Sequence, residues 1–338
     1  MSALAIGLVY DVFGSYRPRP GDPPDAEAEY EPEATVDALA AALALLGHEP
    51  IRIGNAHALL AAAQGGSLPR LDAALSIAEG YGTRNREAWA PVLLDLLEVP
   101  LLGSDALSLS LCLDKAWTHA VVLAAGVPVP EHVSVESPRE LENVKLPGPF
   151  PLFVKPRWEG TAKGIDAGSR VEDAAALAAR VGLVTERYRQ PALVESFLPG
   201  AEYTVTLVGN DPPEVWPTLQ RALARDSGIG LHAVEAEGAP APPHHAPGEL
   251  GGALEAELGQ LALRAFSALR CRDFARLDFK LDAEGRPRFL EINPLPTFAP
   301  DGSFGILAEL QGRAFPELLA QVLGHGLARL GLARLGLG

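Results

Sequence analysis

The chain has few cysteines and no cysteine motif. Among its 338 residues only Cys112 and Cys271 are cysteines, and they lie far apart in the sequence, outside any CxxC or Cys/His pattern. Zinc sites and disulfide frameworks need several closely spaced cysteines, so the sequence argues against both. We expect two reduced, buried thiols in a cytoplasmic protein.

Positive charge is also scarce. Lysine and arginine number 28 against 43 aspartates and glutamates, which leaves a formal net charge of −15. Binding to nucleic acid or to an anionic membrane depends on clustered basic residues, so we expect neither partner. A few local lysines are enough to hold the phosphates of a nucleotide, and the net charge does not exclude such a ligand.

Long apolar runs are missing as well. No run reaches the roughly 20 residues that span a bilayer. The amino-terminal segment MSALAIGLVYDVFG lacks the basic start of a signal peptide and has the apolar content and length of a strand. A chain of 338 residues, 48% of them hydrophobic, has ample material for a buried core and for two or three domains.

Predicted strands and helices alternate in the first third of the chain. LAIGLVYDVFG, IRIG and LDAALSIAEG are predicted strands, and ATVDALAAALALLGHEP and EAWAPVLLDLLEVP are predicted helices. This alternation is typical of parallel strands in an open α/β sheet. From about Lys115 the pattern changes to paired strands, among them a hairpin around the turn at 283–285, which predicts α+β structure. The repeated GLARLGLARLG at the carboxyl end predicts a disordered or loosely packed helical segment without a function.

The hairpin strands carry three oxygen-bearing side chains. Asp278 lies in the middle of RLDFK, and Glu291 and Asn293 lie two apart in RFLEINPLPTF, where Pro294 prevents the strand from continuing. An antiparallel pair can bring Asp278 opposite Glu291 and Asn293. Hard cations such as Mg²⁺ prefer such oxygen ligands, although polar side chains that merely face water at a strand end are the alternative.

A lysine and a glycine-punctuated loop follow an earlier predicted strand. Lys155 ends the apolar segment FPLFVKP, where its ammonium could meet a phosphate or simply extend into water. The loop EGTAKGI offers backbone N–H groups that could cradle phosphate, together with the Thr161 hydroxyl. Gly160 and Gly164 do not have the P-loop spacing, so the loop alone is a weak signal.

The segment VESFLPGAEYTV has the composition of a nucleoside site. Glu195 and Glu202 could bind ribose hydroxyls, and Phe197 and Leu198 between them could form an apolar wall for adenine. An ordinary strand, turn and strand is the alternative.

Charged loops near the amino terminus offer candidate substrate contacts. Glu79 and Arg84 lie in AEGYGTRNRE, after a predicted parallel strand, at the edge where open α/β sheets bind ligands. Arg84 could pair with a carboxylate substrate, and a solvated loop is the alternative. The acidic stretch AEAEYEPE, with four glutamates from Glu27 to Glu33, reads mainly as a solvated loop.

Taken in order, these segments resemble one family. LCLDK, FPLFVKPRWEGTAKGI, ALVESFLPGAEYTV, ARLDFKLD and RFLEINPLP are similar to the motifs of ATP-grasp ligases, and among these to the D-alanine–D-alanine ligase family. The resemblance runs from about Ile6 to Leu319. It implies an ATP-grasp fold with an open parallel α/β domain at 1–114, a central subdomain at 115–201, a carboxyl-terminal subdomain with the metal site at 202–325, and a tail at 326–338.

The resemblance also implies roles for individual residues. Lys115 and Lys155 match the lysines that hold the ATP phosphates, and Arg276 matches the arginine that steadies the transferred phosphoryl group. The loop that closes over the phosphates matches Glu159, Gly160, Thr161 and Gly164. The contacts to adenine and ribose match Glu195, Phe197, Leu198 and Glu202. The ligands of Mg²⁺, or of Mn²⁺ in its place, match Asp278, Glu291 and Asn293. The family further suggests a possible homodimer.

The sequence departs from the family on the substrate side. AEGYGTRNRE replaces the family's His-Gly motif, and no Lys-Tyr loop is found, while Glu33 is the best match to the glutamate that binds the substrate amine and Ser303 to a carboxylate contact. We therefore expect an ATP-dependent ligase that joins an amino acid or small carboxylate to an amine through an acyl phosphate. Arg84 would suit an acidic substrate. Synthesis of D-alanyl-D-alanine and a non-catalytic nucleotide-binding protein are the alternatives.

Overall fold

The first sheet of the computed structural model is parallel, as the sequence predicts. The structure describes residues 3–221, 223, 229 and 252–332. The strands run in the order β2 (Glu49–Gly54), β1 (Ala5–Tyr10), β3 (Ala73–Ile77) and β4 (Leu101–Leu102). Alternate residues of β1 point to opposite faces, so Ile6 and Leu8 belong to one apolar cluster and Val9 to another.

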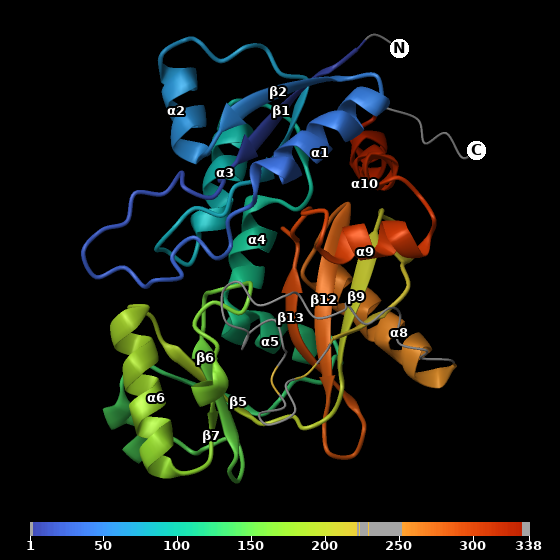
Figure 1. Ribbon diagram of the computed structural model, residues 1–338. Coiled ribbons are helices and arrows are strands. Elements are labelled where there is room, and N and C mark those ends of the chain that lie inside the picture. The colour runs from blue at the N-terminus through green and yellow to red at the C-terminus, as the bar shows by residue number, and fades with distance from the viewer. Residues whose placement is uncertain (1–2, 222, 224–228, 230–251, 333–338) are drawn as a thin grey trace.

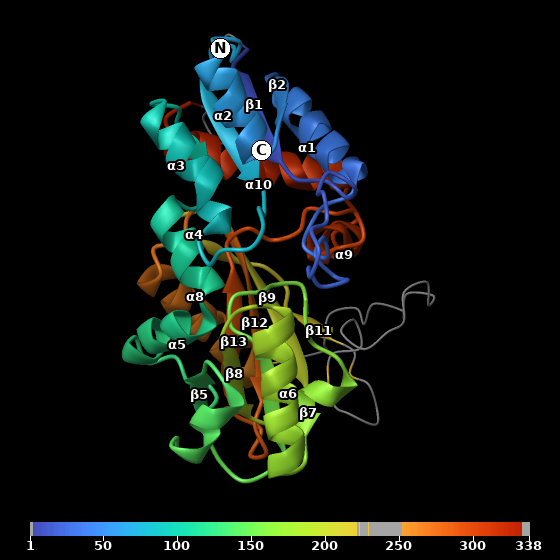
Figure 2. The same ribbon diagram turned by 90° about the vertical axis from the view of Figure 1, so that its left-hand side faces the viewer.

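Helices cover both faces of this sheet. The Val9 face packs against α2 (Ala56–Gln64) and α3 (Trp89–Leu96). The opposite face packs against α1 (Glu33–Leu45) and α10 (Phe315–Arg329), which lie side by side in Figure 1 and Figure 2. The last helix of the described chain therefore completes the first structural unit.

The predicted loosely packed tail is wrong for its described part. Residues 326–329 continue α10, and Leu327 is fully buried in the core of the first unit. The Arg329 guanidinium donates to the buried Asp273 carboxylate, with Nε–Oδ1 and Nη2–Oδ2 distances of 2.6 and 2.8 Å. Burial of Leu327 and this ion pair hold the helix in place, and residues 333–338 of the predicted tail lie outside the described residues.

Two antiparallel sheets follow, as predicted for the α+β part. The central sheet has the order β5 (His132–Val135), β8 (Ala192–Ser196), β6 (Leu152–Pro156) and β7 (Arg170–Val171), with α6 (Ala174–Arg187) on one face. The other sheet has the order β10 (Glu214–Val215), β9 (Glu202–Val208), β12 (Phe274–Leu281) and β13 (Pro287–Asn293), with β11 (Leu219–Arg221) beside β9. Figure 1 shows these two sheets below the first unit.

The remaining helices connect and cover these sheets. Residues of α8 (Ala253–Ala268) and α5 (Lys115–Ala124) pack on the apolar face of the β9–β12–β13 sheet, and α4 (Ala106–Leu113) leads into α5. The other elements are α9 (Ser303–Leu310) and the short 3-10 helices η1 (Arg86–Ala88), η2 (Pro138–Glu142) and η3 (Ala167–Ser169). Within the described part of the chain, no helix is long and apolar enough to cross a membrane.

Candidate active site

A cavity of about 260 Å³ lies between the polar faces of the two antiparallel sheets. On β12, Arg276 lies opposite Asn293, and Asp278 lies opposite Glu291 on one side and Thr204 on the other. Residues that face each other across an antiparallel pair share a face, so these side chains point together into the cavity. The intervening residues, such as Leu277, point the other way into the apolar core beside α8.

The central sheet presents the opposite wall by the same alternation. Phe153 lies opposite Glu195, and Lys155 follows two residues after Phe153, so all three side chains share the cavity face. Val154 and Val194 point to the opposite face and pack with α6. Because the apolar residues of β6 face the core, the alternation along the strand turns the Lys155 side chain toward the cavity.

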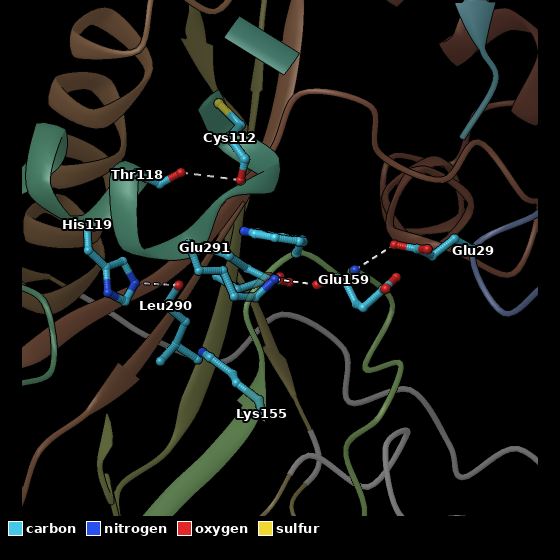
Figure 3. Close-up of polar contacts among 12 residues, drawn as sticks. Glu29, Cys112, Thr118, His119, Lys155, Glu159, Leu290 and Glu291 are labelled. Atoms are coloured by element: carbon cyan, nitrogen blue, oxygen red, sulfur yellow. Dashed lines mark hydrogen bonds and ion pairs between the residues drawn. The ribbon is translucent and has the colours of Figure 1, made fainter. Parts of the chain in front are cut away.

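Two lysine–glutamate pairs line the cavity. Lys155 Nζ lies 2.9 Å from Glu195 Oε2, and Lys115 Nζ lies 3.1 Å from Glu291 Oε2. Lys115 also donates to the carbonyl of Glu159, so Glu291 and Glu159 meet at one ammonium group (Figure 3). Burial opposes ionisation of Glu291, but the nearby Lys115 and Lys155 outweigh it and lower the pKa of Glu291 to about 2.

Arg276 and Asp278 form a third ion pair in the cavity. Arg276 Nε and Nη2 both donate to Asp278 Oδ2, at 3.2 and 3.1 Å, and Thr204 Oγ1 donates to Asp278 Oδ1 at 2.6 Å. Burial disfavours the charged guanidinium, but Asp278 and Glu291 raise the pKa of Arg276 above its usual value. A permanent positive charge therefore stands beside the two carboxylates.

The oxygen donors of the hairpin fit a hard cation. Asp278 and Glu291 supply two carboxylates on paired strands, and Asn293 supplies an amide oxygen that also accepts from Leu295 N at 3.0 Å. No group of three or more His, Cys, Asp or Glu side chains arranged for metal binding is present among the described residues. The protein thus offers three mixed oxygen ligands, a set typical of Mg²⁺ that shares its shell with water and phosphate.

The predicted nucleoside residues lie at one end of the cavity. Phe197, Leu198 and Glu202 line it, with the Lys280 ammonium 3.4 Å from Glu202 Oε2 and 5.9 Å from the centre of the Phe197 ring. The guanidinium of Arg170 lies over the same ring, at 4.6 Å. An aromatic face, an aliphatic side chain and a carboxylate thus adjoin one another.

The other end of the cavity is lined by carboxylates from the first unit and by the segment after β13. Glu31 is buried, and its Oε2 accepts from Thr35 Oγ1 at 2.8 Å. Glu79, Asp301 and Ser303 line the same end of the cavity. Burial raises the pKa of Glu79 well above its usual range, with a further contribution from the neighbouring glutamates. This end of the cavity therefore offers carboxyl groups whose ionised form a bound cationic group would stabilise.

Most of the chain is similar to known ligases. The family described as D-ala D-ala ligase C-terminus matches residues 121–324. An uncharacterized protein of Sinorhizobium fredii is 30% identical over 322 residues, covering 93% of this chain and 92% of that protein. The D-alanine–D-alanine ligase of Sodalis glossinidius is 32% identical over 272 residues, covering 78% of this chain and 71% of that ligase. The chain belongs to the D-alanine–D-alanine ligase family.

Solved structures of ligases in this family share the fold. The Bacillus anthracis D-alanine–D-alanine ligase complexed with ATP aligns with a TM-score of 0.70 at 21% identity and covers 97% of this chain and 98% of its own. The VanG D-Ala:D-Ser ligase of Enterococcus faecalis aligns with the same TM-score at 19% identity, covering 96% of this chain and all of its own. The predicted ATP-grasp fold is thereby confirmed, and the family membership makes this protein an ATP-dependent ligase.

Most of the site residues predicted from the sequence line this one cavity. Those that line it are Glu79, Lys115, Lys155, Glu159, Thr161, Glu195, Phe197, Leu198, Glu202, Arg276, Asp278, Glu291, Asn293 and Ser303. Gly160 lines a smaller adjoining cavity next to Lys115 and Glu291. Gly164 faces away, because its N–H donates to Asp25 Oδ2 at 3.0 Å.

Two predicted substrate residues, Glu33 and Arg84, do not line this cavity. Glu33 is the first residue of α1, where its side chain is 56% exposed and pairs with Arg52 at 3.1 Å. Arg84 is 58% exposed and reaches Asp114 at 3.6 Å. Both residues sit on segments whose inward-facing positions are occupied by close neighbours, Glu31 and Arg86.

The predicted site residues do not include several charged residues around the cavity. They are Glu29, Glu31, Arg86, Lys163, Arg221, Lys280 and Asp301. Lys280 carried a usable signal, because it lies two residues after Asp278 on the same strand and must share its face. Glu29 and Arg86 lie on irregular segments, where no periodicity indicates which side chain turns inward.

Proposed function

We propose that this protein joins the carboxylate of an amino acid to an amine, with ATP as the energy source and an acyl phosphate as the intermediate. The observation that carries the proposal is the convergence of Lys115, Lys155 and Arg276 at one cavity, each beside a carboxylate. Three cations within one cleft can neutralise the polyphosphate and the charge that develops during phosphoryl transfer.

The nucleotide would lie between the two sheets. Lys115 and Lys155 would bind its phosphates, and the loop at 159–165 would cover them with Thr161 and Ala162, which line the cavity. Phe197 and Leu198 would hold the adenine, and Glu202 the ribose. Mg²⁺, or Mn²⁺ in its place, would be held by Asp278, Glu291 and Asn293 and would supply charge neutralisation between the phosphates and the incoming carboxylate.

The proposed reaction has two steps. An oxygen of the substrate carboxylate attacks the γ-phosphorus, and the bond from phosphorus to the β–γ bridging oxygen breaks, so that ADP leaves. The amine of the second substrate then attacks the carbonyl carbon of the acyl phosphate, loses a proton, and expels phosphate as the carbon–oxygen bond breaks. Arg276, which already faces the cavity beside Asp278, would stabilise the transferred phosphoryl group.

The acidic end of the cavity would bind the amino-acid substrate. Glu31 replaces Glu33 as the residue we assign to the substrate ammonium, because Glu31 lines the cavity and Glu33 does not. Glu79 lies at the same end, and Ser303 would contact the substrate carboxylate. Acidic side chains line this end of the cavity, and Arg84 does not. The lining therefore favours a substrate that carries an amine over the acidic substrate predicted from Arg84.

Synthesis of D-alanyl-D-alanine is the second candidate. The relatives named D-alanine–D-alanine ligase, such as that of Sodalis glossinidius, favour it. The altered segments around Glu79 and Arg86 favour another amino acid, because they lie at the substrate end of the cavity. We further propose a cytoplasmic location, since the reaction consumes ATP, and the possible homodimer stays a prediction that light scattering can test.

A phosphate-release screen tests the function. The purified protein is incubated with ATP, Mg²⁺ and pairs of D- and L-amino acids, and the products are identified by mass spectrometry. We expect phosphate release that depends on amino acid and an equal amount of amide. Release with D-alanine alone would support D-alanyl-D-alanine synthesis. ATP binding without release in any pair would instead favour a non-catalytic nucleotide-binding protein.

A further inference from the structure

Arg221 is a second arginine that faces the cavity. It ends β11, where it lies opposite Glu202 of β9. Residues that lie opposite each other in an antiparallel pair share a face, so Arg221 points with Glu202 into the cavity, which both residues line. The side chain of Arg221 therefore stands on the same polar floor as Asp278 and Arg276, one strand further from β12.

Arg221 differs from the other basic residues of the cavity in its partners. Its Nε donates at 2.9 Å to a neutral group, the hydroxyl Oγ1 of Thr204. No carboxylate among the residues that the structure describes lies at ion-pair distance from its guanidinium. The other basic side chains that line the cavity each have a carboxylate oxygen within 3.4 Å, and these are Lys115, Lys155, Lys163, Arg276 and Lys280.

A guanidinium without an anionic partner is unfavourable in this position. Burial lowers the pKa of Arg221 below its usual value, and the positive charge of the neighbouring Arg276 lowers it further. Burial of a charge that no anion neutralises destabilises a folded protein, so such charges are rare unless a ligand supplies the opposite charge. The unpaired Arg221 thus indicates that an anion binds at this side of the cavity.

The Thr204 hydroxyl shows where this anion would lie. Thr204 Oγ1 accepts from Arg221 and donates to Asp278 Oδ1 at 2.6 Å, while Arg276 donates to Asp278 Oδ2 at 3.1 Å. The two guanidinium groups are therefore linked to the two oxygens of one carboxylate, which is a proposed metal ligand. Because Thr204 engages Nε, the terminal nitrogens of Arg221 are left to bind two oxygens of a phosphoryl group.

We propose that Arg221 is a further catalytic residue, a second guanidinium that binds the phosphoryl group while it passes from ATP to the substrate carboxylate. This inference rests on the proposed function. The guanidinium stays protonated and only donates hydrogen bonds, so the bonds made and broken in the transfer step are unchanged. With Arg276 it would share the negative charge that is spread over the equatorial oxygens in the transition state.

The test compares an ATP analogue with ADP. Calorimetry gives the Kd of the β,γ-imido analogue and of ADP, each with Mg²⁺, for the unaltered protein and for Arg221→Met. Only the analogue carries the group to be transferred, so we expect its Kd to rise about 10- to 100-fold and that of ADP to stay within about twofold. Equal weakening of both nucleotides would assign Arg221 to a phosphate that is not transferred. That result, or unchanged binding of both, would overturn the proposal.

Turnover and stability separate a catalytic role from a structural one. We expect kcat for phosphate release to fall at least about a hundredfold in Arg221→Met. Arg221→Lys keeps the charge without the two-pronged donor geometry and should recover only part of this loss. The melting temperature without nucleotide should not fall in Arg221→Met, because no carboxylate loses its partner. A clear fall would make Arg221 a structural residue and overturn the proposal.

Arg286→Met is the matched control. Its side chain is 62% exposed and pairs with Asp282 at 2.9 Å, outside the cavity, so neither Kd nor kcat should change. Normal turnover in Arg221→Met would overturn the role of Arg221 and leave the ligase function intact. Absence of turnover in the unaltered protein would overturn the proposed function itself.

Discussion

The two ends of the cavity are built from different kinds of structure. The nucleotide end is formed by strands β6, β8, β9, β12 and β13, and the predicted side chains on these strands line it. The substrate end is formed largely by irregular segments, where Glu31 and Arg86 turn inward and the predicted Glu33 and Arg84 turn outward. The pleat of a strand fixes side-chain direction in steps of two, and a loop has no such period.

The largest effect is expected at the proposed metal ligands, at the end of the cavity assigned to the nucleotide. Glu291→Gln removes a charge that would hold Mg²⁺ and leaves Lys115 without its carboxylate partner. We expect turnover to fall by at least about a thousandfold while the fold is retained. Initial rates of ADP release measure the loss, and circular dichroism checks the fold. Glu284→Gln, at the exposed turn of the same hairpin, is the matched control, and near-normal turnover in Glu291→Gln would refute the metal assignment.

A smaller effect is expected at Lys155, which we propose binds phosphate. Lys155→Met removes a charge-assisted contact, so we expect the KM for ATP to rise by about 10- to 100-fold. The melting temperature should also fall, because Glu195 loses the partner 2.9 Å away. Lys145→Met, on an exposed segment, should change neither quantity. A KM for ATP that stays at the unaltered value in Lys155→Met would argue against a phosphate contact.

At the substrate end, neighbouring glutamates should behave differently. Glu31→Gln should raise the KM for the accepted amino acid by about tenfold, because the substrate ammonium loses a charged acceptor. Glu33→Gln is the paired control and should leave this KM unchanged, since its side chain pairs with Arg52 outside the cavity. If steady-state assays instead gave a raised KM in Glu33→Gln and an unchanged KM in Glu31→Gln, Glu33 would again be assigned to the substrate ammonium.

A pH-dependent effect on stability is expected beside Arg86. Burial raises the pKa of Glu87 to about 7 from 4.5, against the lowering effect of Arg86. A raised pKa means that the stabilising contribution of Glu87 is present below about pH 4.5 and is lost as the pH rises through 7. Glu87→Gln should therefore gain stability relative to the unaltered protein over this range, by less than about 1.4 kcal/mol per pH unit.

Urea unfolding at several pH values measures the Glu87 effect. The exposed Asp95→Asn, on α3, should keep a constant difference from the unaltered protein across the same pH range. A constant difference for Glu87→Gln would mean that its carboxyl group is not perturbed by burial.

The smallest effect is expected at Arg84. Its side chain is 58% exposed and lies 3.6 Å from Asp114, a buried carboxylate that Arg157 already binds at 2.6 and 2.9 Å, so the Arg84 contact adds little. Arg84→Ala should leave the KM for every accepted substrate within about twofold of the unaltered value. A clear rise for any substrate in steady-state assays would return Arg84 to the site.

The sequence predicts the parts of the fold and of the candidate site where the order of apolar and polar residues along a strand fixes the direction of each side chain. Alternation in β12 and β13, ended by Pro294, predicts that Asp278 and Glu291 lie on paired strands. The register shift between Phe279 and Asp278, which places Glu291 instead of Leu290 opposite Asp278, is not encoded in that alternation. The position of Glu29 depends on a contact with Gly160 far along the chain, which no local pattern encodes. The packing of α10 on α1 is likewise a long-range contact, and the repeated carboxyl-terminal segment indicated weak packing there instead.

The acyl phosphate is the central claim, and oxygen transfer tests it most directly. The accepted amino acid is labelled with ¹⁸O in its carboxylate and incubated with the protein and unlabelled ATP, and the released phosphate is analysed by mass spectrometry. Because the carboxylate oxygen that attacks phosphorus leaves with the phosphate, we predict one ¹⁸O atom in each phosphate released. Unlabelled phosphate, formed together with amide, would contradict the proposed mechanism.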